Sequence, residues 1–289
     1  MRFENEYISL VRKVALYGST RETRVGGARA IFAQTITSND LLDDNLPILT
    51  IRKMFYKPVF GELATLLKGG STLKDFTENG CNYWKADAMR WLYQSNVPVA
   101  YEEDALGNIT NVDLGPIYGA QWRSWSGLGI DQLEMLVEGL KKDPYGRRHV
   151  VSAWNVSQLP NMCLPPCHVM FQCYVDQNLL SIIVYMRSCD VMLGLPADML
   201  LYSGLLALLS NATGYIPGNV TIFMADCHIY ENHIPAVNAL FGIDGGTPVT
   251  HNPPKYKLAS GADVFNFTPE MISVEDYVSG PPVTFKLNT

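Results

Sequence analysis

The chain reads His168-Val169-Met170-Phe171-Gln172-Cys173-Tyr174-Val175 and then Leu180-Ser181-Ile182-Ile183-Val184-Tyr185-Met186. Apolar residues occupy every second position in both runs, and the polar segment Asp176-Gln177-Asn178 separates them. This alternation is typical of two paired strands whose side chains point to opposite faces of a sheet. The two runs therefore predict a β-hairpin with one buried face.

Helical periodicity surrounds this hairpin. Residues 58–68 and 131–142 repeat apolar side chains on one helix face, and a proline suits the first turn of the former. A third helix is predicted over 198–209 and a further strand over 220–224. These elements predict an α+β fold with a largely antiparallel or mixed sheet. No linker rich in Pro, Gly or Ser interrupts them, so we predict one domain over residues 1–289.

The composition is that of a soluble globular protein. Hydrophobic residues make up 47% of the 289 residues, and the net charge of −6 argues against a nucleic-acid partner. The six cysteines form no Cys-x-x-Cys pair, so neither a zinc site nor a disulfide scaffold is predicted. The N-terminus has no apolar signal core, and the most apolar stretch, 199–209, is too short to cross a bilayer. We expect a cytoplasmic protein with reduced thiols, no metal and no membrane contact.

Cys167 is a candidate nucleophile. It follows two prolines, and a hairpin turn centred on residues 177–178 pairs the next residue, His168, with Arg187. Cys167 and Arg187 are then close in space, and a nearby guanidinium lowers the pKa of a thiol. The alternative is a buried structural cysteine, which is the more common environment of an isolated thiol.

Two other segments carry candidate groups. Arg147 and Arg148 follow a turn, and paired guanidinium groups suit a phosphate dianion, with a solvated basic patch as the common alternative. Glu62 lies one step off the apolar stripe of the 58–68 helix, where burial would raise its pKa and suit proton transfer. A surface glutamate is the alternative that this segment alone favours.

Polar residues also gather after the hairpin. Asp190 and Asp198 flank a loop that contains Gly194, and Asp198 opens the predicted helix, so an N-cap role competes evenly with a functional one. His228 and Tyr230 alternate at a strand end and point the same way, either to hold a sugar hydroxyl or to close the edge of the core. A thiol, an arginine set, an acid and these polar groups together fit a small phosphorylated substrate.

The order and number of these motifs resemble the thymidylate synthase family, which includes the deoxycytidylate hydroxymethylases. The resemblance runs through most of the chain and implies a mixed β-sheet with packed helices that dimerises through the sheet. The matching segments are Pro58-Val59-Phe60-Gly61-Glu62-Leu63, Gly115-Pro116-Ile117-Tyr118-Gly119-Ala120-Gln121-Trp122-Arg123, Arg147-Arg148-His149, Pro166-Cys167-His168, Arg187-Ser188-Cys189-Asp190 and Asp226-Cys227-His228-Ile229-Tyr230.

The resemblance implies a folate-dependent reaction at a pyrimidine ring. Cys167 would add to C6, which makes C5 nucleophilic toward the methylene carbon of 5,10-methylenetetrahydrofolate. Glu62 would relay protons through water, and Tyr118 would assist proton removal from C5. The substrate, a pyrimidine nucleoside monophosphate, would be held by Arg24 with Arg21 nearby, Arg187, Ser188, His168, Asp198, His228 and Tyr230, and by Arg147 and Arg148 from the other subunit of a homodimer. The folate would lie against Asp190, Trp84, Leu193, Gly194 and Tyr277.

Asp198 departs from the family pattern. Synthases usually read Leu-Pro-Phe-Asn where this chain has Leu195-Pro196-Ala197-Asp198. An asparagine matches the O4 and N3–H edge of uracil, whereas an aspartate accepts from N4 of cytosine and, when protonated, donates to N3. Asp198 therefore favours a cytidylate, dCMP or CMP, and we count it among the catalytic residues. Two further departures are Met186, where synthases commonly have glutamine, and Asp87, where the family's second tryptophan would fall.

The resemblance leaves the product open. We expect a (deoxy)cytidylate 5-hydroxymethyltransferase, in which water attacks an exocyclic methylene on the base. The alternatives are a dCMP 5-methyltransferase, in which the folate delivers a hydride and becomes dihydrofolate, then a thymidylate synthase acting on dUMP, then a non-catalytic nucleotide-binding relative. Cys167, Glu62, Tyr118 and Asp190 occur together, which argues against the last of these.

Overall fold

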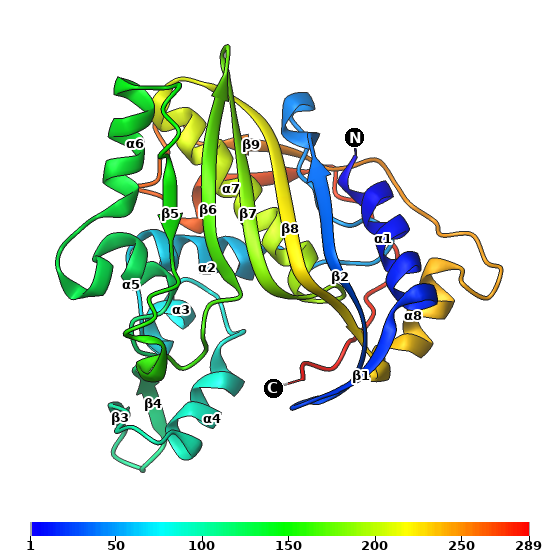
Figure 1. The fold of residues 1–289 in the computed structure, drawn as a ribbon, viewed down its shortest axis with the longest axis horizontal. Helices are drawn as coiled ribbons and strands as arrows, with labels where there is room; N and C mark the ends of the chain where they lie inside the picture. Colours follow the sequence, from blue (N-terminus) through cyan, green and yellow to red (C-terminus); the bar gives the residue numbers. More distant parts are fainter. Residues whose placement is uncertain (1, 289) are drawn as a thin grey trace.

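A six-stranded mixed sheet forms the centre of the computed structural model, which describes residues 2–288 (Figure 1). In spatial order its strands are β1 (Ser19–Thr23), β2 (Gly26–Ser38), β8 (Ile216–Tyr230), β7 (Leu179–Asp190), β6 (His168–Asp176) and β5 (Val150–Ser152). Strands β7 and β8 pair in parallel, because helix α7 (Gly194–Thr213) connects them and returns the chain to the same end of the sheet. The other neighbours pair antiparallel. The predicted α+β class with a mixed sheet is confirmed.

Helices and two short two-stranded sheets lie behind this sheet and along its edges (Figure 1). The remaining α-helices are α1 (Phe3–Tyr17), α2 (Lys57–Leu67), α3 (Leu73–Glu78), α4 (Lys85–Gln94), α5 (Tyr118–Arg123), α6 (Gln132–Lys142) and α8 (Ile234–Phe241). Two-stranded sheets are formed by β3 (Tyr101–Glu103) with β4 (Ile109–Val112), and by β9 (Lys255–Leu258) with β10 (Ile272–Glu275). Short 3-10 helices cover Asp40–Asp43, Trp125–Gly127, Leu159–Asn161, Glu231–His233 and Pro269–Met271.

The predicted hairpin is formed by β6 and β7. Asp176 pairs with Leu179, and Gln177 adopts a left-handed φ of 53° in the turn between them. A bulge after the first residue of β6 shifts the register, so His168 pairs with Met186 and the predicted pairing with Arg187 is wrong by one residue.

The predicted proximity of Cys167 and Arg187 is nevertheless confirmed. The Arg187 backbone N–H donates to the Cys167 carbonyl oxygen at 3.0 Å, a distance typical of a bond between paired strands. The bulge therefore changes which residue faces His168, but it keeps the cysteine and the arginine on adjacent strands.

Helix α7 is longer than predicted and begins at Gly194, one turn before Asp198. The prediction that Asp198 opens this helix as its N-cap is therefore wrong, because the preceding turn is already helical. The helix is apolar and long enough to span a membrane by composition, but 78% of its most apolar window is buried inside the protein. Such burial is typical of a core helix.

The other predicted elements differ from the structure mainly at their ends. Helix α2 covers residues 57–67 and is followed by Gly69 at a φ of 77°. Helix α6 has Asp131 as its N-cap, whose Oδ1 accepts from the N–H groups of Leu133 and Glu134. Strand β8 extends the predicted 220–224 strand in both directions, and β1 and β2 were not predicted because their sequence does not alternate.

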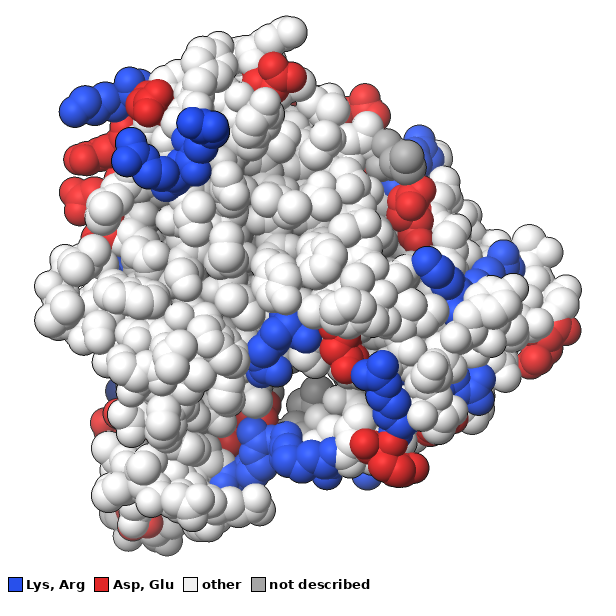
Figure 2. Space-filling view, in the orientation of Figure 1, with Lys and Arg blue, Asp and Glu red and all other residues white. Residues whose placement is uncertain are grey.

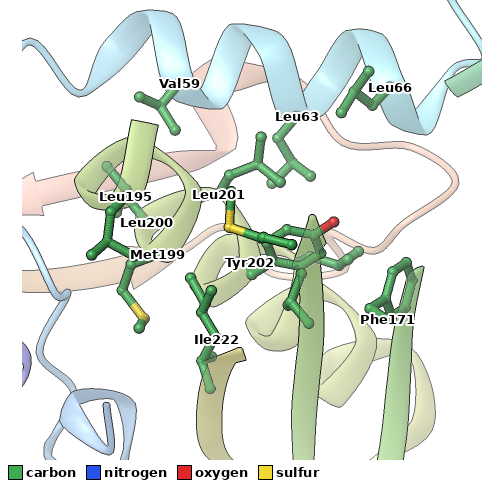
Figure 3. Close-up of a cluster of buried hydrophobic side chains, with 14 of the residues drawn as sticks. Val59, Leu63, Leu66, Phe171, Leu195, Met199, Leu200, Leu201, Tyr202 and Ile222 are labelled. Carbon is green, nitrogen blue, oxygen red and sulfur yellow. The ribbon is translucent and has the colours of Figure 1, made fainter. Parts of the chain in front are cut away.

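The core lies between α2, α7 and one face of the sheet, and Figure 3 shows side chains from all three meeting there. Leu63 comes from α2, Tyr202 from α7 and Phe171 from β6, and each is at most 1% exposed. Gly204 of α7 allows the close approach of α2, since a Cβ at this position would lie 3.0 Å from Leu63 Cδ2 and 3.2 Å from Phe60 Cε1.

The opposite face of the sheet carries no helix over β6, β7 and β8 (Figure 1). Tyr185 of β7 stacks on Phe223 of β8 there, with ring centroids 5.3 Å apart. Tyr174 and Ile183 are 63% and 46% exposed, and Phe32 of β2 is 72% exposed. A contiguous apolar surface of this kind is characteristic of a subunit interface.

Candidate functional site

Cys167 directly precedes β6 and lies beside Arg187 of β7. The Arg187 Nε donates to the Pro166 carbonyl oxygen at 2.8 Å, and Nη2 donates to that of Pro165 at 2.6 Å. The same Nη2 lies 3.8 Å from the Cys167 Sγ, and the guanidinium stands 5.7 Å from the ring centroid of Trp154. These contacts hold a positive charge against the thiol without any substrate.

Tyr118, at the start of α5, fixes the backbone of the same cysteine. Its hydroxyl oxygen accepts from the Cys167 N–H at 2.7 Å, and its ring lies 4.8 Å from that of His168. Burial raises the pKa of the Cys167 thiol, and the Arg187 charge lowers it by less. Arg187 therefore acts on the thiol in the expected direction, but the net pKa is raised because desolvation outweighs the arginine.

Glu62 of α2 faces the site and not solvent. The alternative that its segment favoured, a glutamate on the helix surface, is therefore wrong. The Trp84 Nε1–H donates to its Oε1 at 2.9 Å. Burial raises the pKa of Glu62 to about 7, and the nearby Asp198 charge raises it further while the tryptophan bond lowers it. Trp84 packs on Phe76 at 5.1 Å and lies 6.1 Å from the Tyr118 ring. A carboxyl group with this pKa exchanges protons near neutral pH.

Asp198 pairs with the histidine that follows the cysteine. The Asp198 Oδ1 lies 2.9 Å from the His168 Nε2, and the His168 Nδ1 lies 3.2 Å from the Tyr202 hydroxyl. Burial by itself lowers the pKa of His168, but the Asp198 carboxylate more than compensates and the pKa is raised. Because α7 starts at Gly194, the Asp198 side chain lies one turn inside the helix and reaches across to β6.

Asp190 ends β7 and shapes the turn into α7. Its Oδ1 accepts from the N–H groups of Met192 at 2.8 Å and Leu193 at 3.4 Å. Burial raises the pKa of Asp190, while these backbone bonds and nearby histidines lower it. Leu193 is the N-cap residue of α7, and Gly194 is its first residue. The three predicted folate contacts Asp190, Leu193 and Gly194 therefore form one turn.

The residues predicted to bind the sugar and the phosphate lie near the paired ends of β1, β2 and β8. The His228 Nδ1 lies 3.0 Å from the Asp226 Oδ1, and its ring lies 5.0 Å from that of Tyr230, so the two rings do face the same way. Arg21 of β1 reaches the Asp226 Oδ2 at 3.6 Å, and Arg24 lies exposed in the turn that follows β1. Figure 2 shows Lys and Arg side chains gathered around a hollow between the α4 and β1 regions of Figure 1.

Four predicted residues lie elsewhere or have structural partners. Arg147 and Arg148 are exposed in the loop after α6, and neither has an ion-pair partner within residues 2–288. Ser188 is partly buried and pairs with Asp226 across β7 and β8. The Tyr277 hydroxyl donates to the Leu49 carbonyl oxygen at 2.8 Å and accepts from a backbone N–H, so it anchors the segment before α2.

Three polar residues at this site were not singled out from the sequence. Tyr202 contacts His168. The sequence offered one signal for it, because Tyr202 carries a hydroxyl in an apolar helix and follows Asp198 by four residues, on the same helix face. Arg52 is buried, donates to the Met192 carbonyl oxygen and stands 5.2 Å from the Phe285 ring centroid. His233 is buried and lies 2.8 Å from the Lys286 carbonyl oxygen. The last two had no sequence signal, because their partners are far away along the chain.

The structure thus brings a thiol, a guanidinium, a near-neutral carboxyl and a histidine–aspartate pair to one end of the sheet. A family model described as Thymidylate synthase matches residues 5–289, which is nearly the whole chain. The match contains every element that carries these groups.

Proposed function

The chain belongs to the thymidylate synthase family, and on this premise we propose that it transfers a hydroxymethyl group to C5 of a cytidylate. Family membership indicates a folate-dependent transferase that acts at C5 of a pyrimidine nucleotide. The choice of cytosine and of the hydroxymethyl product is our proposal, and it rests on the residues around the thiol.

The observation that carries the choice of cytosine is the geometry of Asp198. One of its oxygens lies 2.9 Å from the His168 Nε2, and the second oxygen of the carboxyl group is the candidate acceptor for the base. A carboxylate oxygen accepts hydrogen bonds, so it matches the amino group at C4 of cytosine and opposes the carbonyl at C4 of uracil. A mismatch would leave buried polar groups unpaired, at a cost of about 1–3 kcal/mol per group.

In the proposed mechanism Cys167 attacks C6 once the phosphate and the base are held. Tyr118 keeps the cysteine backbone in place, and Arg187 stabilises the thiolate. This addition makes C5 nucleophilic, and C5 then attacks the methylene carbon of the folate. Glu62, with a pKa of about 7, then relays protons through water as C5 loses its hydrogen. The bond from the methylene carbon to the folate nitrogen breaks in this step, so tetrahydrofolate leaves and an exocyclic methylene remains on the ring. Water adds to the exocyclic methylene, and release of Cys167 restores the C5=C6 bond.

The direct test incubates dCMP, CMP and dUMP separately with methylenetetrahydrofolate. Mass spectrometry identifies the nucleotide product, and the absorbance of dihydrofolate reports hydride transfer. We expect a 5-hydroxymethylcytidylate without dihydrofolate. A methylated product with stoichiometric dihydrofolate would overturn the hydroxymethyl assignment and leave the methyltransferase alternative.

Asp198→Asn tests the assignment of the base. An amide matches the edge of uracil better than that of cytosine, so the ratio of kcat/KM for dCMP to that for dUMP should fall by at least about tenfold. Steady-state rates on both nucleotides measure this ratio. Asp244→Asn is the matched control, since Asp244 lies in the segment after α8. An unchanged ratio in Asp198→Asn would contradict the role of Asp198.

We also propose that the enzyme is a homodimer with arginines shared between subunits. Arg147 and Arg148 have no acidic partner among residues 2–288 of their own protomer and extend from the loop before the edge strand β5. A dimer formed through that face brings the pair toward the phosphate region of the other subunit. Two bidentate guanidinium groups there would add to Arg187 in binding a phosphate dianion.

A further inference from the structure

An ion pair lies on α4 where the family's second tryptophan would fall. Asp87 and Arg90 lie on successive turns of α4, and the Arg90 Nη2 is 2.6 Å from the Asp87 Oδ1. Their side chains are only 14% and 19% exposed. An aromatic ring at this position would make this wall of α4 apolar, whereas the largely buried ion pair makes it polar.

The first turn of α4 faces the reacting thiol. Trp84 is the N-cap residue of this helix, and its indole donates to Glu62 and lies 6.1 Å from the ring of Tyr118. Asp87 is one turn further along and so shares the face of Trp84. The negative charge of Asp87 also acts on the cysteine. Burial is the main cause of the raised pKa of Cys167, and the Asp87 charge raises that pKa further.

Groups on other elements also respond to the Asp87 charge. Burial raises the pKa of Asp87 itself, whereas Arg90 and then Arg24, from the turn after β1, lower it. Arg24 on the turn after β1 and Arg90 on α4 therefore act on the same carboxylate from two different elements.

The ion pair is incompletely satisfied. The Arg90 Nη1 is buried and has no hydrogen-bond partner within residues 2–288, and the Asp87 carboxylate that binds Nη2 lies beside it. An unpaired buried donor costs about 1–3 kcal/mol, so such groups normally bind ordered water. A donor and an acceptor side by side in a polar wall make a water site.

We propose that Asp87, held by Arg90, positions the water that attacks the exocyclic methylene and accepts a proton from it. The inference rests on the proposed hydroxymethyl function and names the residue that determines its product. The water oxygen forms a bond to the methylene carbon, and one water proton passes to the Asp87 carboxylate. The electron pair of the exocyclic double bond returns to the ring, and expulsion of the Cys167 thiolate forms C5=C6. Asp87 then loses its proton to solvent, so no oxidant or reductant is required.

The test compares two steps in the same reaction. Tritium release from [5-³H]dCMP measures carbon transfer and loss of the C5 hydrogen, and mass spectrometry measures 5-hydroxymethyl product. Asp87→Asn keeps the shape of the side chain but removes the base. We expect tritium release within about twofold of the unaltered enzyme and at least about a tenfold lower product-to-tritium ratio. Intact-protein mass spectrometry should then detect nucleotide that remains attached to Cys167.

Two further variants separate a chemical role from a structural one. Asp87→Trp should also lower the product-to-tritium ratio, because an indole excludes water from the wall. Glu103→Gln is the matched control, since Glu103 is an exposed carboxylate of β3 in the same part of the molecule, and its ratio should equal that of the unaltered enzyme.

The outcomes distinguish the two levels of the argument. An unchanged ratio in Asp87→Asn would overturn the role of Asp87 and leave the proposed function intact. If the unaltered enzyme released no tritium from either cytidylate, or formed a methylated product, the proposed function would fail and this inference with it. A parallel loss of tritium release and product in Asp87→Asn, with Asp87→Trp behaving alike, would assign the ion pair to folding or binding and overturn the inference.

Discussion

Glu62 combines a buried position with a single indole donor, and its pKa of about 7 follows from that imbalance. Removing its charge should have opposite effects on activity and on stability. Glu62→Gln cannot relay a proton, so we expect kcat to fall by about 10²–10⁴-fold. A pH profile of kcat/KM should show an ionisation near 7 in the unaltered enzyme and none in the variant.

The effect on stability has a defined sign. The folded-state pKa of Glu62 is raised from 4.5, so stability is complete at low pH and decreases as the pH rises toward 7. Above that pH, Glu62→Gln should be more stable than the unaltered protein by up to about 3 kcal/mol. Thermal unfolding at pH 5 and pH 8 measures this, with exposed Glu78→Gln as the control. Equal stabilities at pH 8 would contradict the buried carboxylate.

Cys167 is the residue on which covalent chemistry depends. Cys167→Ala should abolish tritium release from C5 and nucleotide turnover, because no other thiol in the described chain contacts Arg187. Nucleotide binding should remain within about threefold, since the phosphate and base are held by other side chains. Buried Cys173→Ala is the matched control and should retain activity. Residual tritium release in Cys167→Ala would exclude attack by this sulfur.

The sequence predicted a contact in the site where a local pattern, such as strand alternation, pairs two residues. The alternation of β6 and β7 was sufficient to place Cys167 beside Arg187. It was insufficient for the pKa of that thiol, since burial is a property of the whole fold. The position of Glu62 likewise depends on Trp84, which belongs to another helix.

Among the elements, the β6–β7 hairpin was predictable and its bulge was not. Alternation specifies which face of a strand is buried, but a bulge is set by how the strand meets its neighbours, here at His168. The start of α7 was missed for a related reason. Gly194 and Pro196 indicate a loop in isolation, yet tertiary packing makes them the first turn of a buried helix.

Helix α2 carries Glu62, and its approach to the loop after α3 depends on Gly61. A Cβ at this position would overlap the carbonyl oxygen of Asn79. Gly61→Ala should therefore destabilise the fold by about 3 kcal/mol and lower the melting temperature by about 6–12 °C. Differential scanning calorimetry measures the shift. Gly246→Ala, where a Cβ meets only an ordinary contact at 3.6 Å, is the control and should change the melting temperature little.

At the scale of the whole molecule, the open sheet face and the unpaired arginines point to one assembly. Tyr185 and Phe223 stack on that face, and Arg147 and Arg148 extend from the loop before β5. The periodicity of the sequence could not predict these features. A strand with both faces buried in a dimer has the same pattern as a strand with one exposed face in a single protomer.

Mixed dimers test the sharing of arginines. Cys167→Ala homodimers should be inactive and Arg148→Ala homodimers only weakly active. A dimer of one with the other contains one site in which an intact cysteine meets an intact partner arginine, so coexpression should restore about a quarter of the activity per protomer. Sedimentation confirms that dimers form. Failure to recover activity in isolated mixed dimers would place Arg148 outside the partner's site.

The bonds from Arg187 to the carbonyl groups of Pro165 and Pro166 have a consequence for metabolism. An incoming anion cannot recruit this guanidinium without disturbing the two prolines that precede the sulfur. A free nucleoside carries no phosphate and cannot make this contact with Arg187. We therefore expect the enzyme to act on nucleotides and to leave free nucleosides unmodified.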